Sequence, residues 1–520
     1  MKKRDFILFL IMMLLFSIVY FFVSIIYLDL FNLGLFPVKS FLNTGNIIYF
    51  IFSSMVFFAG LLILLERRDP AKTLAWLLVL VFLPVVGFVL YLIFGRHPRK
   101  RRISNKKRLL KNRILPFDPS FWQETHDFIA RNKEAQEKSR LISLIYNNAD
   151  FPPTINNEIK ILTDGKEIFP NFIQAIKEAK HHIHLETYIL RNDHIGQTIA
   201  DLLCAKARAG VTVRLIYDGI GSRSLGRAYL NKLRSAGVNV AAFLPVKLPL
   251  LHRKINYRNH RKILVVDGKI GFVGGANIGD EYLGKNPSIG YWRDTHVRLK
   301  GSAVCFLQKI FLQDWQFVTQ QTLDLNIPEL FPMEKVQGNH IVQITASGPD
   351  SQWEAIMQVY YYTIATAEKS VYITSPYFIP NESILTALKT AALSGVDVKL
   401  LLPAVPDHRI VYWAAMSYLE ELLEAGAEVY FYHNGFIHAK VLTVDEIVSS
   451  IGSANMDQRS FNLNFEVNAY IYDKETALRL NEEFFNDLKH SQRLTLEEFR
   501  KRPLRHHFIE SVARLFSPLL

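Results

Sequence analysis

One pattern of residues occurs twice in this chain, and it constrains the fold more than any other feature of the sequence. HRKILVVD at 260–267 and HAKVLTVD at 438–445 each place a lysine two positions after a histidine and an aspartate five positions after the lysine. GGAN at 274–277 and GSAN at 452–455 then follow at the same offset. One such motif is a weak signal, but two full matches with the same continuation indicate an internal duplication.

The duplication extends beyond the motifs. GVTVRLIYDG at 210–219 corresponds to GVDVKLLLPA at 395–404, and in both copies short β-rich runs alternate with helical ones. This alternation is typical of a mixed α/β domain. We therefore predict two homologous α/β domains that pack about a pseudo-twofold axis, at 151–325 and 339–500, joined by a linker at 326–338.

The repeated motif predicts a β-hairpin that carries the histidine and the lysine. The aliphatic run at 263–266 indicates a buried strand, and Asp267 and Gly268 form a turn pair before the next strand. Because side chains alternate along an extended strand, His260 and Lys262 share one face and can point at the same ligand. Asp267 lies at the far end of the hairpin, which favours a structural role over a direct part in a reaction.

Each copy supplies the same four kinds of polar side chain. YWRDTHVRL in the first copy aligns with LNFEVNAYI in the second, which places Asp294 opposite Glu466. The predicted set comprises two histidines, two lysines, two asparagines and two carboxylates: His260, Lys262, Asn277, Asp294, His438, Lys440, Asn455 and Glu466.

Two histidines with two lysines and no metal motif suit attack on a phosphodiester. A neutral imidazole can attack phosphorus and form a phosphohistidine, while a second, protonated imidazole gives its proton to the departing alcohol. The two rings must then hold opposite protonation states. We expect Asp294 and Glu466 to orient the ring nitrogens that do not react, and the lysines and asparagines to surround the non-bridging oxygens.

The other histidines predict no metal site. His181, His182 and His184 are clustered, but neighbouring residues of a strand point to opposite faces, so the three cannot all face one ion, and no spaced partner ligand accompanies them. His408 lies in a predicted loop, where it can contact either substrate or solvent. We predict neither a metal nor a cofactor.

Residues 1–95 form a predicted membrane region. Hydrophobic residues make up 49% of the chain, and their excess is concentrated in runs near 6–27, 46–65 and 73–94. Each run approaches the ~20 residues that a helix needs to cross a bilayer. We predict transmembrane helices for the first two runs. The third contains LPVVG at 83–87, whose proline and glycine favour a re-entrant or interfacial hairpin, with a complete span as the alternative.

Basic residues predict the orientation. Lys2, Lys3 and Arg4 precede the first run, and the segment 96–113, within a predicted juxtamembrane linker at 96–150, is the most basic part of the chain. Because basic flanks stay on the cytoplasmic side, the domains that follow are predicted to face the cytoplasm. The net charge of +13 fits either nucleic acid or an anionic membrane, but its position beside the hydrophobic runs favours anionic headgroups over nucleic acid.

Residues 501–520 form a predicted amphipathic tail. Ile509, Val512, Leu515 and Phe516 fall on one face of a helix. Either this face helps to hold the site at headgroup depth in a membrane, or it packs on the domain in front of it.

The paired motifs resemble those of the phospholipase D superfamily. RRDPAKTLAWLLVL at 67–80, PDHRIVYW at 406–413 and GSANMDQRSFNLNFEVN at 452–468 resemble, within that superfamily, the bacterial cardiolipin synthases. The resemblance covers nearly the whole chain. It implies N-terminal transmembrane helices followed by two phospholipase D-like α/β domains, in a multi-pass protein of the bacterial cell membrane.

The resemblance also implies a reaction, in which a phosphatidyl group passes from one phosphatidylglycerol to the terminal hydroxyl of another and gives cardiolipin and glycerol. His260 is the expected nucleophile and His438 the expected acid and base, although the symmetry of the sequence leaves the reverse assignment open. Phospholipid hydrolysis and a membrane-tethered nuclease are the alternative activities, and a scaffold without activity leaves two intact motifs unexplained. The implied catalytic residues are His260, Lys262, Asp267, His438, Lys440 and Asp445.

Overall fold

The computed structural model describes most of the chain after residue 118 and part of the segment before it. The described residues are 57, 60, 61, 63–65, 70–91, 119–245, 256–287, 290–325, 327–332 and 336–520. The predicted helix at 6–27 and the basic segment at 96–113 lie outside the described residues, as do most positions of the predicted helix at 46–65. The chain forms two compact units, Met1–Pro98 with Leu250–Arg253 and Arg99–Pro249 with Lys254–Leu520.

In the first unit, the third hydrophobic run folds into two short helices. They are α3 (Pro70–Phe82) and α4 (Pro84–Leu90). Leu83 between them has non-helical backbone angles. Pro84 explains the break, since proline disfavours the helical conformation of the residue before it and suits the first turn of a new helix. The rings of Trp76 and Tyr91 meet edge to face with centroids 5.4 Å apart, so α4 folds back against α3.

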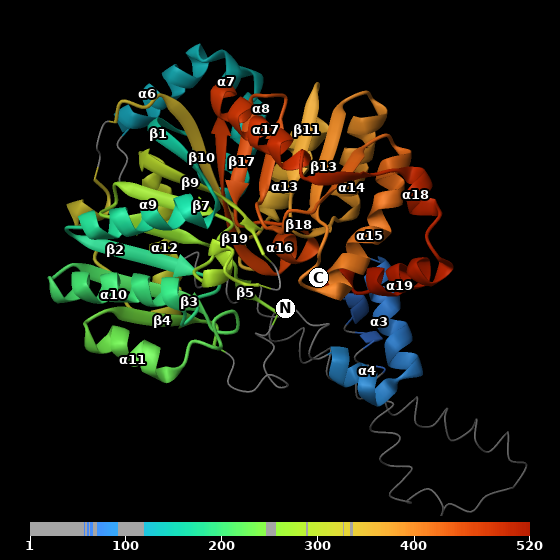
Figure 1. The fold of residues 1–520 in the computed structure, drawn as a ribbon, viewed down its shortest axis with the longest axis horizontal. Coiled ribbons are helices and arrows are strands. Elements are labelled where there is room, and N and C mark those ends of the chain that lie inside the picture. Colours follow the sequence, from blue (N-terminus) through green and yellow to red (C-terminus); the bar gives the residue numbers. More distant parts are fainter. Residues whose placement is uncertain are drawn as a thin grey trace, which may run out of the picture. The chain divides into compact units, whose positions relative to one another are not determined.

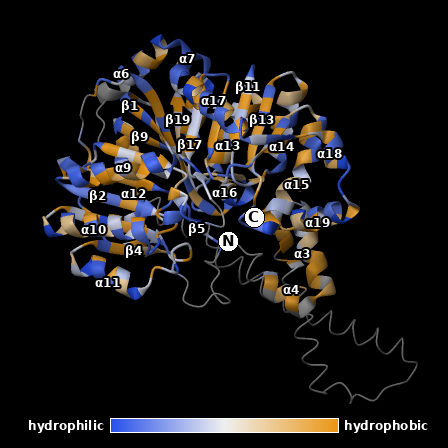
Figure 2. Cartoon of the chain, viewed as in Figure 1, coloured by the Kyte–Doolittle hydropathy of each residue, from blue (hydrophilic) through white to orange (hydrophobic). Residues whose placement is uncertain are grey.

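Hydrophobic residues predominate along α3 and α4 (Figure 2). Within the described ranges, no helix combines the length and the hydropathy that a membrane crossing requires. The course of the segment 73–94, spanning or re-entrant, stays a prediction.

The second unit contains both copies of the duplicated sequence, preceded by three helices. These helices are α6 (Pro119–Arg131), α7 (Lys133–Glu137) and α8 (Ser139–Ala149). The first copy comprises β1 (Thr154–Thr163), α9 (Asp164–Glu178), β2 (His182–Thr187), α10 (His194–Arg208), β3 (Thr212–Asp218), α11 (Arg227–Ser235), β4 (Asn239–Phe243), β5 (Arg258–Asn259), β6 (Ile263–Val266), β7 (Ile270–Gly274), β8 (Trp292–Arg293), β9 (Thr295–Gly301) and α12 (Val304–Thr319).

The second copy repeats this order of its main elements, with short additional elements, and adds a C-terminal extension. It comprises β10 (His340–Ser347), α13 (Ala355–Ala365), β11 (Ser370–Thr374), β12 (Phe378–Ile379), α14 (Glu382–Leu393), β13 (Asp397–Pro403), α15 (Arg409–Glu424), β14 (Glu428–Tyr432), β15 (Phe436–Ile437), β16 (Val441–Val444), β17 (Val448–Gly452), β18 (Met456–Asp457), α16 (Gln458–Asn462), β19 (Asn464–Tyr472) and α17 (Lys474–Leu488). The short additional elements are β12, β18 and α16, and the extension comprises β20 (Ser491–Leu494), α18 (Leu496–Arg500) and α19 (Leu504–Arg514).

A single sheet runs through both copies (Figure 1). Its strand order is β4-β3-β2-β6-β7-β9-β1-β10-β19-β17-β16-β11-β13-β14-β20, and β5 pairs with β19. The first strands of the two copies, β1 and β10, pair antiparallel at the centre. Equivalent strands follow outward in the same order on both sides, as an internal duplication predicts. The two copies therefore share one sheet instead of forming separate bodies.

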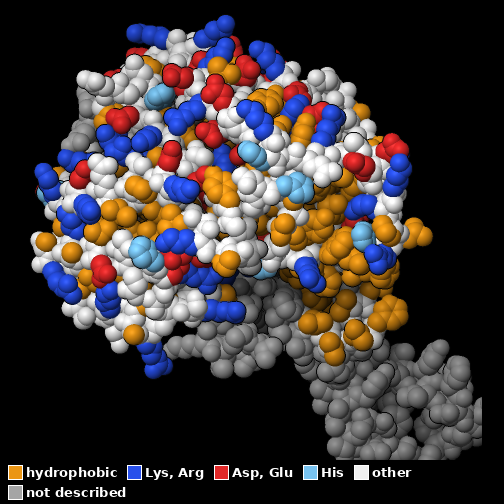
Figure 3. Space-filling model, viewed as in Figure 1, with side chains coloured by type: hydrophobic (Ala, Val, Ile, Leu, Met, Phe, Trp, Pro, Cys, Tyr) orange, Lys and Arg blue, Asp and Glu red, His pale blue; other side chains and the backbone are white. Residues whose placement is uncertain are grey.

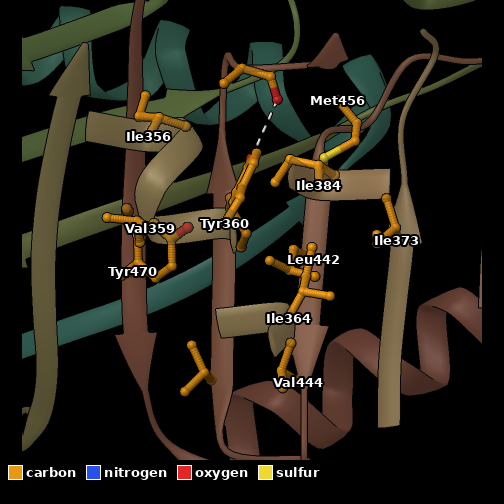
Figure 4. Packing of buried hydrophobic residues seen from close by; sticks show 14 of the residues in the cluster. Ile356, Val359, Tyr360, Ile364, Ile373, Ile384, Leu442, Val444, Met456 and Tyr470 are labelled. Carbon is orange, nitrogen blue, oxygen red and sulfur yellow. Dashed lines mark hydrogen bonds between the residues drawn. The ribbon is translucent and has the colours of Figure 1, made fainter. Parts of the chain in front are cut away.

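Each copy buries both faces of its strands, with three helices on one face and one on the other. His184 of β2 stacks on Phe311 of α12 with ring centroids 4.5 Å apart, and Tyr372 of β11 stacks on Phe484 of α17 at 5.2 Å. The neighbouring residue Ile373 points the opposite way, into the core formed with α13 and α14 (Figure 4). This double burial explains why the strands are continuous hydrophobic runs.

Asp267 and Asp445, the last residues of the two motifs, anchor the hairpins. The carboxylate of Asp267 accepts hydrogen bonds from the backbone N–H groups of residues 180–182, at the start of β2. Asp445 accepts in the same way from residues 368–370 and also from the ammonium of Lys138. Both carboxylates are engaged in holding a strand end, and neither lines the cavity where the motif histidines meet, so a structural role for Asp267 and Asp445 is favoured and their part in the reaction stays a prediction.

We expect Asp267→Ala to lower the free energy of unfolding by about 1–3 kcal/mol, because the N–H donors at the start of β2, one of them buried, lose their acceptor. Asp267→Asn should cost less, since asparagine keeps one acceptor oxygen and tolerates the positive φ of 52° at this position. Urea and thermal unfolding measure both effects. Asp201→Ala, at a side chain that is 65% exposed, is the control and should change stability by no more than about 0.5 kcal/mol.

The pH dependence of this effect has a defined sign. Burial by itself raises the pKa of Asp267, but the backbone hydrogen bonds outweigh it and hold the pKa below its ordinary value of 3.8. A carboxylate whose pKa is depressed by folding stabilises the fold above its unfolded pKa and loses that contribution as the pH falls. The difference between wild type and Asp267→Ala should be full at neutral pH and shrink below about pH 4. A variant with wild-type stability but no activity would instead give Asp267 a part in the reaction.

Candidate active site

A cavity of about 830 Å³ is lined by residues of both copies. Of the eight polar side chains that the sequence predicts, His260, His438, Asn277 and Asn455 line its wall. The two lysines and the two carboxylates are buried and contact this wall from within the protein. The structure therefore gathers both halves of the predicted site around one space.

Each motif histidine is held by a carboxylate of the opposite copy. Nδ1 of His260 lies 3.1 Å from Glu466, and Nδ1 of His438 lies 2.7 Å from Asp294. Because an ionised carboxylate only accepts hydrogen bonds, each Nδ1 carries the proton and donates it. The neutral tautomer then leaves Nε2 as the nitrogen with a free electron pair.

Two short parallel bridges between the copies produce this crosswise arrangement. β5 pairs with the start of β19, and the N–H of His260 donates to the carbonyl of Phe465 at 2.9 Å. β15 pairs with β8, and the N–H of His438 donates to the carbonyl of Arg293 at 2.7 Å. In both bridges the strand that leads into a histidine is paired with the strand that leads into its carboxylate. Backbone pairing thus sets the distance between ring and carboxylate.

Burial lowers the pKa of both histidines. The pKa of His260 falls to about 4, chiefly through burial, although Glu466 opposes the shift. The pKa of His438 falls well below its usual range, again through burial, and the nearby Lys440 and Lys262 add to the effect. Both imidazoles are therefore neutral in the unliganded site at neutral pH. The opposite protonation states that the sequence predicts must then arise when an anionic substrate binds.

The motif lysines are tied to the histidines that precede them. Nζ of Lys262 donates to the carbonyl of His260 at 2.6 Å, and Nζ of Lys440 donates to the carbonyl of His438 at 2.5 Å. Burial lowers the pKa of Lys440 to about 8 and that of Lys262 well below its usual range, while the site's carboxylates oppose both shifts. An anion in the cavity would therefore stabilise the charged form of both lysines.

The two motif asparagines differ in how they are held. Asn277 accepts a hydrogen bond from the N–H of Ile189 and donates to the hydroxyl of Tyr282, so its amide is fixed on both sides. In the described part of the chain, Oδ1 of Asn455 has no hydrogen-bond partner. The copies are thus equivalent in sequence position but not in local bonding.

Two sequence differences between the copies are coupled in space. A Cβ atom at Gly275 would lie 2.1 Å from Oδ1 of Asp294, so the first copy requires glycine there. The second copy has Ser453 at the equivalent position, and its hydroxyl donates to the longer Glu466 at 2.5 Å. The first copy thus combines Gly275 with the shorter Asp294, and the second copy combines Ser453 with the longer Glu466.

This coupling predicts a non-additive pair of substitutions. Gly275→Ser should destabilise the fold by about 1–3 kcal/mol, because the new side chain overlaps the carboxylate of Asp294. Adding Asp294→Glu recreates the arrangement of the second copy and should recover part of the loss, with a coupling energy of about 0.5–3 kcal/mol in a double-mutant cycle. Gly275→Ser combined with the distant Asp201→Glu is the matched control and should be additive. Additivity of the Gly275 and Asp294 changes would contradict the coupling.

Several functional side chains escape prediction from the motifs. Glu466 is also held by the hydroxyl of Ser460 at 2.9 Å and by the amide of Asn464 at 3.2 Å. Asn464 lines the cavity and occupies the position equivalent to Trp292, which also lines it. The alignment of YWRD with LNFE could have identified this pair, since both residues stand two positions before the orienting carboxylate.

The remaining candidate histidines fall into two groups. His182 and His184 are bridged by the side-chain amide of Gln308, and Arg214 also contacts His184, so their ring nitrogens serve a buried polar network. Among the described residues, no cluster of histidine, cysteine and carboxylate side chains is suited to a metal ion. His408 lines the cavity with a side chain that is 67% exposed.

A family model described as "Cardiolipin synthase, PLD-like domain" matches residues 172–315 and 360–488, one match in each copy. A second model, described as "Phospholipase_D-nuclease N-terminal", matches residues 55–96. The predicted pair of homologous phospholipase D-like α/β domains is thereby confirmed.

Relatives align with nearly the full chain. A cardiolipin synthase of Alkalihalophilus pseudofirmus is 49% identical over 471 residues, which cover 90% of this chain and 93% of the relative. The major cardiolipin synthase of Bacillus subtilis is 46% identical over 473 residues, which cover 89% and 97%. Among solved structures, a phosphatidylserine synthase of Haemophilus influenzae has a TM-score of 0.56 at 16% identity and covers 74% of this chain and 100% of its own, which supports the fold alone.

The family model matches both copies, and the relatives align with about nine-tenths of the chain. The resemblance predicted from the paired motifs is confirmed. This chain belongs to the bacterial cardiolipin synthase family, whose two domains are phospholipase D-like.

Proposed function

We propose that this chain is a cardiolipin synthase that transfers the phosphatidyl group of one phosphatidylglycerol to the terminal hydroxyl of a second, with release of glycerol. One observation carries the proposal: both motif histidines line a single cavity, and each is oriented by a carboxylate of the opposite copy. Two oriented imidazoles on one cavity suit a double displacement at phosphorus, in which one attacks and the other moves the proton.

In the first half-reaction, Nε2 of His260 attacks the phosphorus of the donor lipid. A P–N bond forms and the P–O bond to the glycerol headgroup breaks, while protonated His438 gives its proton to the departing oxygen. The product is a phosphatidyl-histidine at His260. Glu466 keeps the Nδ1 proton of His260 in place and stabilises the positive charge that develops on that ring.

In the second half-reaction, the terminal hydroxyl of another phosphatidylglycerol attacks the same phosphorus. His438 accepts the proton of this hydroxyl, the new P–O bond forms, and the P–N bond breaks to restore His260. One phosphodiester replaces another, so the exchange is reversible and needs no nucleotide. The relative concentrations of phosphatidylglycerol, cardiolipin and glycerol set its direction.

Because the pKa values of both histidines are lowered, the bound substrate must itself raise the pKa of one of them. Both imidazoles are neutral in the unliganded cavity because burial disfavours their charged forms. A phosphodiester brings a negative charge into the same buried space, which raises the pKa of the imidazole nearest its leaving oxygen. Lys262 and Lys440 supply positive charge to the non-bridging oxygens of the phosphate. The side chains of Asn277 and Asn455 supply polar contacts to the same oxygens.

The dimensions and lining of the cavity support headgroup transfer. A volume of about 830 Å³ is within the usual range for sites that bind small molecules. Aromatic rings flank the histidines: Tyr188 lies 5.1 Å from His260, and Trp292 lies 5.3 Å from His438. Such walls limit the access of water to a phosphohistidine and thereby favour transfer over hydrolysis.

We further propose that the enzyme is a multi-pass protein of the bacterial cell membrane. The helices at 6–27 and 46–65 anchor it, and the segment 73–94 forms a re-entrant hairpin. The packing of α4 back onto α3 supports the hairpin over a complete span. The basic linker at 96–150 contacts anionic headgroups, and the domains at 151–325 and 339–500 lie on the cytoplasmic side.

The proposed reaction predicts a specific pair of products. Purified full-length protein in bilayers that contain labelled phosphatidylglycerol should form cardiolipin and glycerol in equal amounts, as mass spectrometry can measure. His260→Ala and His438→Ala should each lower the rate by about 10³-fold or more, because each removes a group needed in both half-reactions. His433→Ala, at an exposed histidine outside the cavity, is the control. Phosphatidic acid as the main product would mean that the enzyme hydrolyses the lipid. If neither cardiolipin nor phosphatidic acid forms, the proposal is overturned.

A lipid with a good leaving group separates the roles of the two histidines. With phosphatidyl-p-nitrophenol the leaving oxygen needs no proton, so His438→Asn should still release one equivalent of nitrophenolate and retain a phosphatidyl group on His260. His260→Asn should release none. Because the carboxylates act crosswise, Glu466→Gln should slow this burst by about 10²-fold while Asp294→Asn leaves it nearly unchanged. The reverse pattern would exchange the nucleophile and the acid.

A further inference from the structure

The C-terminal helix α19 presents hydrophobic side chains to the outside of the protein. Leu504, Phe508 and Leu515 are 86%, 72% and 78% exposed, and Ile509, Val512 and Phe516 are exposed beside them. Figure 3 shows hydrophobic side chains gathered over this part of the surface. An exposed apolar patch of this kind marks an interaction site, because the solvent-facing surface of a soluble protein seldom carries one.

Packing on the domain already accounts for the inner side of α19. Ala513 is buried, and the carboxylate of Glu510 is buried and paired with Arg502 at 2.6 Å. Arg514 donates to the carbonyl of Ser417 and pairs with Glu421 on α15. The outer hydrophobic side chains take no part in these contacts, so domain packing alone explains only half of the amphipathic pattern.

The chain runs directly from α19 to the catalytic cavity. Leu519 and Leu520 line that cavity, together with Arg459 of α16. The N–H of Arg459 donates to the carbonyl of Leu520 at 2.9 Å, and its guanidinium donates to the carbonyl of Leu519 at 3.1 Å. The exposed helix and the cavity rim are thus parts of one continuous, hydrogen-bonded segment.

We propose that the outer face of α19 docks on the surface of an anionic phospholipid bilayer and so places the rim at Leu519 and Leu520 at headgroup depth. The inference rests on the proposed function, in which both substrates are phospholipids. The charges of the helix suit this partner: its single carboxylate, Glu510, is already paired, and Arg505 is exposed. A helix of this type sinks its apolar side chains about 5–10 Å into the interface.

Arg459 offers a guanidinium to a lipid phosphate at the docked rim. Its guanidinium lies in the cavity wall beside the rim and donates to the carbonyl of Leu519. A lipid phosphate that enters past Leu519 therefore meets a guanidinium before it reaches the motif histidines. The order of contacts, from apolar helix to basic side chain to imidazole, lets the acyl chains stay at the bilayer while the phosphate passes Arg459 and reaches the histidines.

Depth-sensitive quenching tests the docking without reference to activity. The two native cysteines, Cys204 and Cys305, are 1% and 3% exposed, so a cysteine introduced at the surface can be labelled selectively. We would label Phe508→Cys, Leu515→Cys and the matched control Leu393→Cys, which is 73% exposed on α14, with an environment-sensitive fluorophore. The full-length variants are then placed in nanodiscs that contain phosphatidylglycerol and either nitroxide-labelled lipid or aqueous iodide.

The labels at 508 and 515 should be quenched by the lipid-borne nitroxide and protected from iodide, and the label at 393 should behave in the opposite way. Quenching at all three positions by iodide alone would overturn the proposal. Protection from both quenchers at 508 and 515 would also overturn it, since the face would then be covered by protein.

A charge placed in the interface tests the consequence for turnover. Phe508→Asp combined with Leu515→Asp should lower phosphatidyl transfer in nanodiscs roughly tenfold or more, while transfer between short-chain lipids dispersed in water stays at the wild-type rate. Leu393→Asp should alter neither rate. An equal loss with dispersed lipids would contradict docking and indicate damage to the site. Absence of cardiolipin from the wild-type protein would refute the proposed function and leave the quenching result to decide the docking.

Discussion

Each reactive imidazole depends on a carboxylate from the other copy of the duplicated sequence. The crosswise pairs of His260 with Glu466 and His438 with Asp294 require the two copies to keep one relative position to within about 0.5 Å. The continuous sheet meets this requirement, since β1 pairs with β10 at its centre and two parallel bridges join the strands that carry the four residues. Buried Arg293 adds contacts with α17 of the second copy. Neither copy contains a complete site by itself.

The same burial that fixes the geometry also sets the charge state. Two imidazoles and two ammonium groups share a space with little water, and burial pushes the pKa of each below its ordinary value. The unliganded site is therefore less positively charged than its composition suggests. An anionic phosphodiester supplies the missing counter-charge, so substrate binding and proton uptake are coupled.

The sequence predicts the duplication, the motif hairpins and the eight polar side chains, because all three follow from spacing and alternation along the chain. It does not predict which carboxylate serves which histidine, because the symmetry of the copies makes both pairings equally consistent with the spacing. It also predicts opposite protonation states for His260 and His438, whereas burial, a property of the folded protein, lowers both pKa values alike. The cavity rim at Leu519 and Leu520 arises from a contact with Arg459 that carries no motif of its own.

The coupling of Gly275 with Asp294 and of Ser453 with Glu466 limits how the two copies can exchange sequence. Transfer of both members of a pair leaves a compatible combination, but serine at position 275 beside an unchanged Asp294 has no room for its Cβ atom. At these positions the two halves of the site can therefore change only in matched pairs.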